Sequence, residues 1–272
     1  MKDPLSEPRD NPFLDDVRRT RLKAWASWLL LPVCLPQAFW VRRRQSRLMP
    51  PAGPLLRTVG SSGAIDQPHR APLRLLVMGD STVAGVGTGR LEDALPVQIA
   101  QVLSAAVDRP VALHIAGNSS ATASDLRDHV LRHLPRDSFD VIVLVIGVND
   151  AKNLHTVKRF SRAFSTLVYG LKARFPSALV AHCPIVPLSV IPLLPQPLKT
   201  LLRWRSDVID ARAACLCAAG GVVRFARHMD FPAEGFARDG FHVNETGAKL
   251  WAEEVVRELM GMPAFRERLR SG

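Results

Sequence analysis

The clearest indication of the fold is the stretch VIVLVIGVND, at residues 141–150. Its first six residues are all apolar and mostly β-branched, and glycine and two polar residues follow closely. A continuous apolar run, without alternation, is typical of a strand buried on both faces, as in a parallel sheet. The sequence therefore predicts a central buried strand over Val141–Ile146.

Strand-like and helix-like stretches alternate on both sides of this run. Further apolar runs occur at 73–78, 111–115, 178–185 and 222–225. Apolar residues with helical spacing occur at 92–106, 124–134, 155–175, 199–219 and 245–260. This alternation predicts an α/β fold with a mainly parallel five-stranded sheet covered by helices on both faces.

Length and composition fit one such domain with an N-terminal extension. The chain has 272 residues, of which 47% are hydrophobic and 22% charged. Its net charge is +11, but residues 1–57 alone hold eleven Lys/Arg against five Asp/Glu. The body of the chain therefore has only a modest positive surplus, and with 6% aromatic residues it offers no evident stacking platform. We expect no nucleic-acid partner.

Neither a metal nor an organic cofactor is expected. The four cysteines include only one close pair, Cys215 and Cys217, and their C-x-C spacing is not a zinc pattern. Reduced thiols in a cytosolic setting are the simpler expectation. The glycine-rich stretch at 85–89 is G-x-G-x-G, and a dinucleotide fingerprint requires G-x-G-x-x-G directly after a strand. A nucleotide-binding module is therefore disfavoured.

An uncharged apolar segment, Ala24–Val41, lies between two clusters of basic residues. Its eighteen residues are marginal for a membrane span, which needs about 20, and Pro32 and Pro36 predict a kink. Aromatic residues occur near its ends, where membrane interfaces favour them: Trp25, Trp28, Phe39 and Trp40. The segment is therefore predicted to associate with a membrane surface.

Arginines on both flanks favour the cytoplasmic face, because crossing once would translocate one cluster. We expect a kinked or re-entrant segment that tethers the enzyme at that face. A signal anchor with the domain outside and a core helix of the main domain are the alternatives. A cleavable secretory signal is disfavoured because no small-residue cleavage site follows.

The chain is predicted to have five parts. Residues 1–23 are a disordered basic start, and 24–47 are the membrane-associating segment with its basic flank. Residues 48–72, rich in proline and glycine, are a linker. The folded domain covers 73–262, and 263–272 form a tail.

Polar residues follow the predicted strands, at the edge where sites in parallel sheets gather. Gly79-Asp80-Ser81 follows the first strand, and Ser120 lies in the turn after the second. Asn149 follows the third strand, and Asp239-Gly240-Phe241-His242 precedes the last helix. Each of these could alone be a turn or a helix cap. Four of them in this order predict one catalytic centre.

The residue types suit nucleophilic catalysis. Ser81 at a strand-to-helix turn is the predicted nucleophile, His242 its base, and Asp239 the carboxylate that orients His242. The oxyanion is predicted to be bound by the backbone N–H groups of Ser81 and Ser120 and by the side-chain amide of Asn149.

The same motifs resemble those of the SGNH (GDSL-type) hydrolase superfamily, over about Leu73 to Leu259. Gly79-Asp80-Ser81 resembles its nucleophile block, Asn149 its asparagine, and Asp239-x-x-His242 its acid and base block. The second block departs from the pattern, because Ser120 stands where the family usually has glycine. The resemblance implies a three-layer α/β/α, flavodoxin-like fold and esterase or lysophospholipase-like activity.

We therefore expect a serine esterase that hydrolyses carboxylic esters, with lipid or acyl esters favoured, through an acyl-enzyme. An acyltransferase with the same machinery and a non-catalytic membrane adaptor are the alternatives. The proline-rich, apolar stretch 183–199 follows the fourth strand and is predicted to overhang the site. Such an apolar wall would favour acyl chains over sugars.

Overall fold

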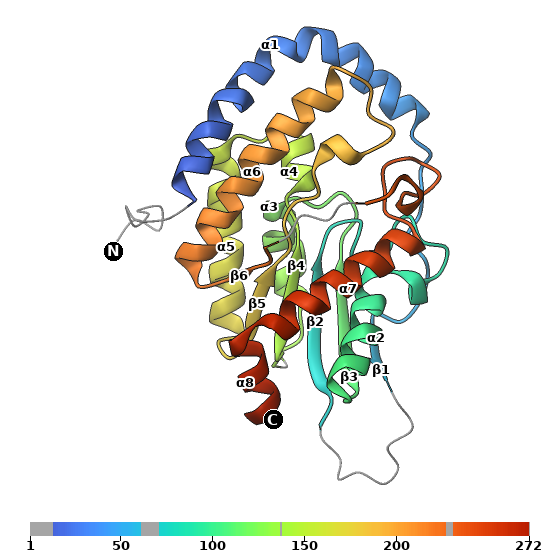
Figure 1. The fold of residues 1–272 in the computed structure, drawn as a ribbon, viewed down its shortest axis with the longest axis vertical. Coiled ribbons are helices and arrows are strands. Elements are labelled where there is room, and N and C mark those ends of the chain that lie inside the picture. The colour runs from blue at the N-terminus through green and yellow to red at the C-terminus, as the bar shows by residue number, and fades with distance from the viewer. Residues whose placement is uncertain (1–12, 61–70, 137, 227–230, 272) are drawn as a thin grey trace.

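A single twisted sheet forms the centre of the protein (Figure 1). The structure is a computed structural model, and it describes residues 13–60, 71–136, 138–226 and 231–271. The sheet has the strand order β1-β3-β2-β4-β5-β6. The strands are β1 (Leu56–Val59), β2 (Leu73–Gly79), β3 (Val111–Gly117), β4 (Val141–Val145), β5 (Leu179–His182) and β6 (Val223–Arg224).

Strands β2 to β6 are parallel and correspond to the five predicted strands. Strand β1 is an addition, because it pairs antiparallel with β3 inside the stretch predicted to be linker. Its residues alternate between exposed and half-buried. This edge strand has only four residues, between Pro54 and Gly60, so its alternating pattern is short. The surrounding prolines and glycines therefore led to the prediction of a linker.

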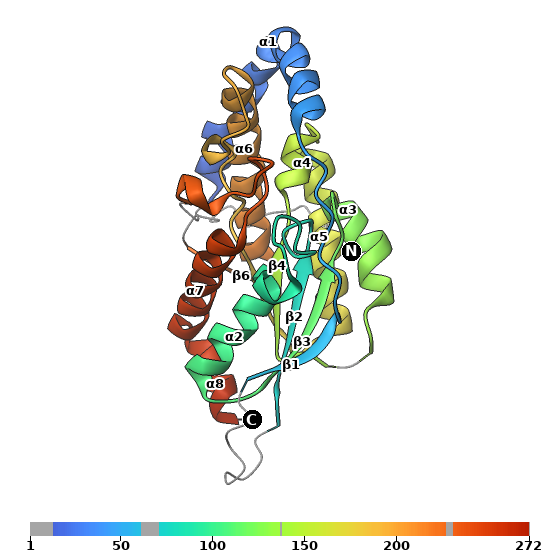
Figure 2. The same cartoon turned by 90° about the vertical axis from the view of Figure 1, so that its right-hand side faces the viewer.

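Helices cover both faces of the sheet (Figure 2). Helices α2 (Leu95–Val107) and α7 (Glu245–Gly261) pack side by side on one face. The other face carries α3 (Ala123–Asp125) and α5 (Val157–Arg174), with α6 (Leu198–Gly220) packed against α5. The predicted helix at 124–134 is irregular: α3 continues into a π-helical turn and a 3₁₀ turn. The predicted α/β/α layering is confirmed.

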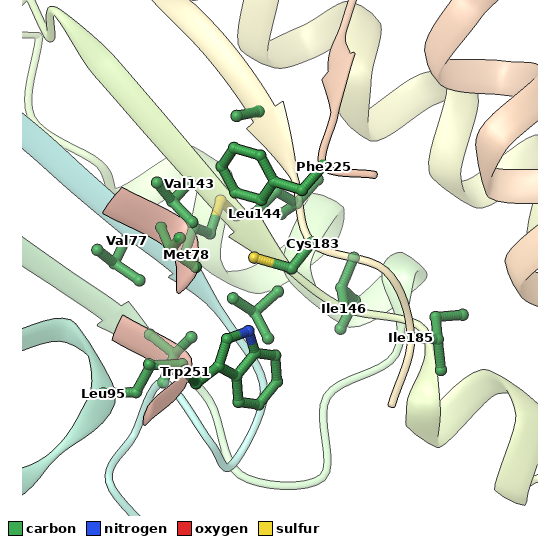
Figure 3. Packing of buried hydrophobic residues seen from close by; sticks show 14 of the residues in the cluster. Val77, Met78, Leu95, Val143, Leu144, Ile146, Cys183, Ile185, Phe225 and Trp251 are labelled. Atoms are coloured by element: carbon green, nitrogen blue, oxygen red, sulfur yellow. The ribbon is translucent and has the colours of Figure 1, made fainter. Parts of the chain in front are cut away.

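The core is continuous between the layers. All five residues of β4 are buried, in agreement with the run that predicted it. Figure 3 shows side chains of the strands, such as Met78 and Val143, packed with Leu95 from α2 and Trp251 from α7. Four cysteines, Cys34, Cys183, Cys215 and Cys217, are buried free thiols.

The N-terminal region differs from its prediction. A 31-residue helix, α1 (Leu14–Arg44), begins well before residue 23, where the disordered start was predicted to end. Residues 1–12 lie outside the described part of the chain. The predicted tail is also helical over α8 (Pro263–Ser271). The early start of α1 is explained by tertiary contacts, because its first turns pack on α6. The charge and proline content of residues 1–23 does not include these contacts.

Helix α1 contacts α6 along one narrow stripe. The buried residues of α1 recur at intervals of three or seven, the spacing of a coiled-coil seam: Val17, Ala24, Ser27, Cys34 and Val41. The Gln37 side chain donates to the backbone oxygen of Gln196 at 2.6 Å and accepts the backbone N–H of Leu198 at 3.0 Å. The Arg205 guanidinium lies 5.3 Å from the Trp28 ring centroid. These contacts hold α1 against the start of α6 and against a point near its middle.

The rest of α1 is exposed, and it is apolar. Only 22% of its most apolar 18-residue window is buried. Exposed side chains on it include Leu22, Trp25, Leu29, Val33 and Phe39. The helix arches over α6 and contains both Pro32 and Pro36 without interruption (Figure 1). Its length and composition are those of a helix that could cross a membrane, and the core-helix alternative does not fit its exposure.

Candidate active site

Three of the predicted residues meet at the carboxyl edge of the sheet. The Ser81 Oγ lies 3.2 Å from the His242 Nε2, and the His242 Nδ1 lies 2.6 Å from the Asp239 Oδ2. Ser81 follows β2, whereas the other two lie in the turn before α7, so residues far apart in the sequence form one hydrogen-bonded relay. Such a relay can move a proton from the serine hydroxyl to the imidazole.

Asp239 is held in its ionised form. Its Oδ1 accepts the backbone N–H groups of Phe241 and His242, both at 3.0 Å. Burial alone would raise the pKa of this carboxyl, but the hydrogen bonds from the His242 side chain and from these two amides outweigh burial and hold the pKa at about 2. A fixed carboxylate beside Nδ1 keeps that nitrogen protonated and leaves Nε2 free to accept a proton.

The turn that carries Ser81 has little freedom. A side chain at Gly79 would collide with the backbone oxygen of Val145 and with Val83, so only glycine fits the end of β2. The next residue, Asp80, is buried and accepts the backbone N–H of Thr82 at 3.0 Å. Burial raises the pKa of Asp80 to about 6, against the lowering effect of that hydrogen bond and of nearby positive charge.

Asn149 lies at the start of a short helix, α4 (Val148–Lys152), directly after β4. Its Nδ2 donates to the backbone oxygen of Ala121 at 3.0 Å and lies 3.5 Å from the Asp80 Oδ2. The neighbouring Asp150 accepts the backbone N–H of Ala123 at 3.0 Å. These bonds fix α4 to the turn after β3, so Asn149 and Ser120 are positioned by one network.

Ser120 has the backbone conformation that glycine usually supplies. Its φ is +64°, in the left-handed region that a residue with a Cβ adopts at a cost of about 1–2 kcal/mol. The two residues after it lead into a capping box, in which Thr122 and Asp125 exchange hydrogen bonds. The substitution of serine for glycine therefore preserves the turn.

A small apolar pocket of about 40 Å³ lies beside Ser81 and His242. The loop predicted to overhang the site does so, because Pro184, Ile185, Val186 and Ile191 line this pocket. A volume of this size holds about three water molecules. The pocket therefore accepts only a short group.

Two residues near the site were not singled out from the sequence. The Lys152 Nζ lies 5.4 Å from the Phe241 ring centroid, and the Phe241 ring lies edge-on to His242 at 5.3 Å. Burial lowers the pKa of Lys152, which the charge of Asp80 opposes. Lys152 and Phe241 could have been inferred from the sequence only because they lie close to Asn149 and His242 along the chain. Within the described ranges, no group of three or more His, Cys, Asp or Glu side chains is arranged to hold a metal ion.

Comparison with known proteins identifies relatives of this chain. Residues 77–250 match the model of the GDSL-like Lipase/Acylhydrolase family. A GDSL-like esterase of Mycobacterium tuberculosis is 28% identical over 189 residues, which cover 66% of this chain and 60% of that protein. The match thus spans less than two thirds of that relative's length.

Solved structures share the fold. A carbohydrate acetylesterase from Sinorhizobium meliloti, Est24, is 18% identical with a TM-score of 0.51, covering 69% of this chain and 98% of that one. The lipase Lip_vut3 from a goat rumen metagenome is 14% identical with a TM-score of 0.53, covering 68% and 97%. At these identities both similarities establish the fold alone.

Proposed function

Because the chain belongs to the GDSL-like lipase/acylhydrolase family, we propose that it hydrolyses carboxylic esters through an acyl-enzyme formed on Ser81. The observation that carries the proposal is the unbroken hydrogen-bonded relay from Ser81 through His242 to Asp239. A serine hydroxyl is a weak nucleophile unless a base within hydrogen-bond reach takes its proton. His242 is in that position, and no metal or organic cofactor is needed for this chemistry.

The reaction proceeds in two halves. His242 Nε2 takes the proton of the Ser81 Oγ as that oxygen bonds to the ester carbonyl carbon, giving a tetrahedral intermediate with a negative oxygen. His242 then gives the proton to the departing alcohol, and the acyl group stays on Ser81. In the second half His242 takes a proton from a water molecule as the water oxygen bonds to the acyl carbon. The bond from that carbon to the Ser81 Oγ then breaks, His242 returns the proton to the Ser81 Oγ, and the carboxylic acid is released.

The negative oxygen is bound by three N–H donors in this proposal: the backbone groups of Ser81 and Ser120 and the Asn149 side chain. One Asn149 Nδ2 hydrogen is donated to Ala121. The other has only the long 3.5 Å contact with Asp80 in the free enzyme, so it is available to the oxyanion.

Substitution of the nucleophile tests this function. Ser81→Ala is expected to lower the rate of ester hydrolysis at least about a thousandfold. The matched control is Ser177→Ala, an exposed serine in the turn before β5, at the edge of the sheet opposite the site, with hydrolysis unchanged. Hydrolysis by Ser81→Ala at close to the wild-type rate would refute the proposal.

We also propose that α1 holds the enzyme on the cytoplasmic face of a membrane. One stripe of α1 is occupied by α6, while its remaining surface is exposed and apolar, with Trp25 and Leu29 74% and 79% exposed. A helix in the plane of the interface buries such a face in the headgroup region. The arginines at both ends would contact anionic lipid, each contributing about 1 kcal/mol.

Fractionation of the full chain and of a chain starting at Met49, which lacks α1 but keeps β1, tests the tether. The full chain is expected in the membrane fraction and the shorter chain in the soluble fraction. A full chain that stays soluble refutes the tether. Digestion by protease added from outside the cell refutes the orientation and supports a signal anchor instead.

A further inference from the structure

We infer that α1 also forms part of the substrate site: the acyl chain of the ester lies in an apolar cleft between α1 and α6. This inference rests on the proposed esterase function and adds where the chain binds. The α1–α6 cleft has a volume of about 520 Å³. Its walls include Leu31, Leu35 and Ala38 from α1 and Leu198, Leu201 and Leu202 from α6.

The volumes of the two cavities motivate the assignment. The pocket beside Ser81 offers about 40 Å³, too little for more than a short group. The α1–α6 cleft, at about 520 Å³, lies within the roughly 300–1,000 Å³ of small-molecule sites. Eleven of the sixteen residues that line the cleft are leucine, valine, alanine, cysteine or phenylalanine, and the polar ones include Lys152 and Arg42. The cleft thus offers a lipid-like ester a large space with a mainly apolar lining next to the catalytic residues.

The cleft adjoins the catalytic centre. Phe241 lines both the small pocket and the cleft, and its ring contacts His242. Ser120, a proposed oxyanion donor, lines the cleft as well. An ester whose carbonyl oxygen is near Ser120 therefore has its chain at the entrance to the cleft.

The geometry of α1 makes the cleft a route from the membrane. The two helices lie side by side, with α1 arching over α6 in the upper part of the molecule (Figure 1). On α1, Trp25, Leu29 and Val33 are exposed outside the cleft, whereas Leu35 and Ala38 line its open side. A chain leaving the bilayer beside α1 would thus pass from one apolar surface of this helix to another.

Chain-length selectivity tests the inference. The full-length protein is bound to vesicles of ether-linked phosphatidylcholine, which has no ester to cleave, and kcat/KM is measured for p-nitrophenyl octanoate and acetate. The wild type is expected to favour octanoate by more than about tenfold, because each methylene removed from water contributes about fourfold. Ala38→Trp, which fills the cleft, is expected to lower the octanoate-to-acetate ratio by about tenfold or more.

Two further variants make the result specific. Val33→Trp places the same side chain on the outer surface of α1 and is expected to leave the ratio unchanged. Leu35→Gln keeps a side chain of similar volume but makes the wall polar, and is expected to lower the ratio by about threefold or more. Each variant's circular dichroism spectrum reports whether α1 remains folded.

An unchanged ratio in both Ala38→Trp and Leu35→Gln would overturn the inference, as would a wild type that favours acetate. An equal fall of the ratio in Val33→Trp would also overturn it. Failure of the underlying function has a different signature: neither ester is hydrolysed, or Ser81→Ala still hydrolyses acetate.

Discussion

The buried carboxyl of Asp80, next to the nucleophile, is expected to destabilise the folded protein at neutral and alkaline pH. It is 2% exposed, and its pKa is raised from 3.8 to about 6 by burial. A carboxyl with a raised pKa binds its proton more tightly in the folded state. Its favourable contribution to stability is present below pH about 4 and is lost as pH rises through 6.

Asp80→Asn removes this pH dependence while its side-chain oxygen can still accept the Thr82 N–H. A shift of about two pKa units corresponds to about 3 kcal/mol. The variant's free energy of unfolding, relative to wild type, is therefore expected to be more favourable at pH 8 than at pH 4 by up to about 3 kcal/mol. Urea unfolding of both proteins at both pH values measures this difference, in which any pH-independent change in packing cancels.

Asp140→Asn is the matched control with the opposite sign. Burial would raise the pKa of Asp140, but hydrogen bonds from the Arg74 side chain and backbone outweigh it and lower the pKa. Its contribution to stability is therefore present above about pH 4 and is lost only as pH falls further, so the stability of this variant relative to wild type should change little between pH 8 and pH 4 and should rise only at lower pH. Equal effects of Asp80→Asn at both pH values would refute the reasoning on burial.

Three further substitutions test the site. Asp239→Asn is expected to lower kcat by up to about 10⁴-fold, because the amide favours the wrong histidine tautomer; a change below tenfold, measured by steady-state kinetics, would contradict the orienting role. Asn149→Ala is expected to lower kcat by about 10²–10³-fold with a smaller change in KM, and an effect on KM alone would argue against oxyanion binding. Ser120→Gly, which relieves the φ of +64°, is expected to retain activity and to raise the free energy of unfolding by about 1 kcal/mol or less in urea titrations; a loss of stability would show that the serine side chain, and not the backbone, holds the turn.

The parallel sheet and the position of the site could be predicted from local sequence. The run at 141–146 is buried on both faces, and burial of this kind leaves an uninterrupted apolar pattern in the sequence. Polar residues that directly follow such strands meet at one edge of the sheet, which is why Ser81, Asn149 and the turn at Asp239 could be assigned to one centre.

Features that depend on tertiary contacts could not be predicted in this way. Strand β1 forms by pairing with the edge strand β3. The first turns of α1 are stabilised by packing of one side of the helix against α6. The left-handed φ of Ser120 occurs in the turn that the hydrogen bonds of Asp150 and Thr122 hold, and serine itself does not indicate it. The α1–α6 cleft likewise requires the positions of both helices.

The central claim is that Ser81 becomes covalently acylated, and labelling tests it most directly. The protein is incubated with a fluorophosphonate, which reacts with activated serine hydroxyls, and its tryptic peptides are analysed by mass spectrometry. We predict one adduct, on Ser81, that is lost when His242→Ala removes the base. An adduct on another serine, or labelling of Ser81 that persists without His242, would contradict the account.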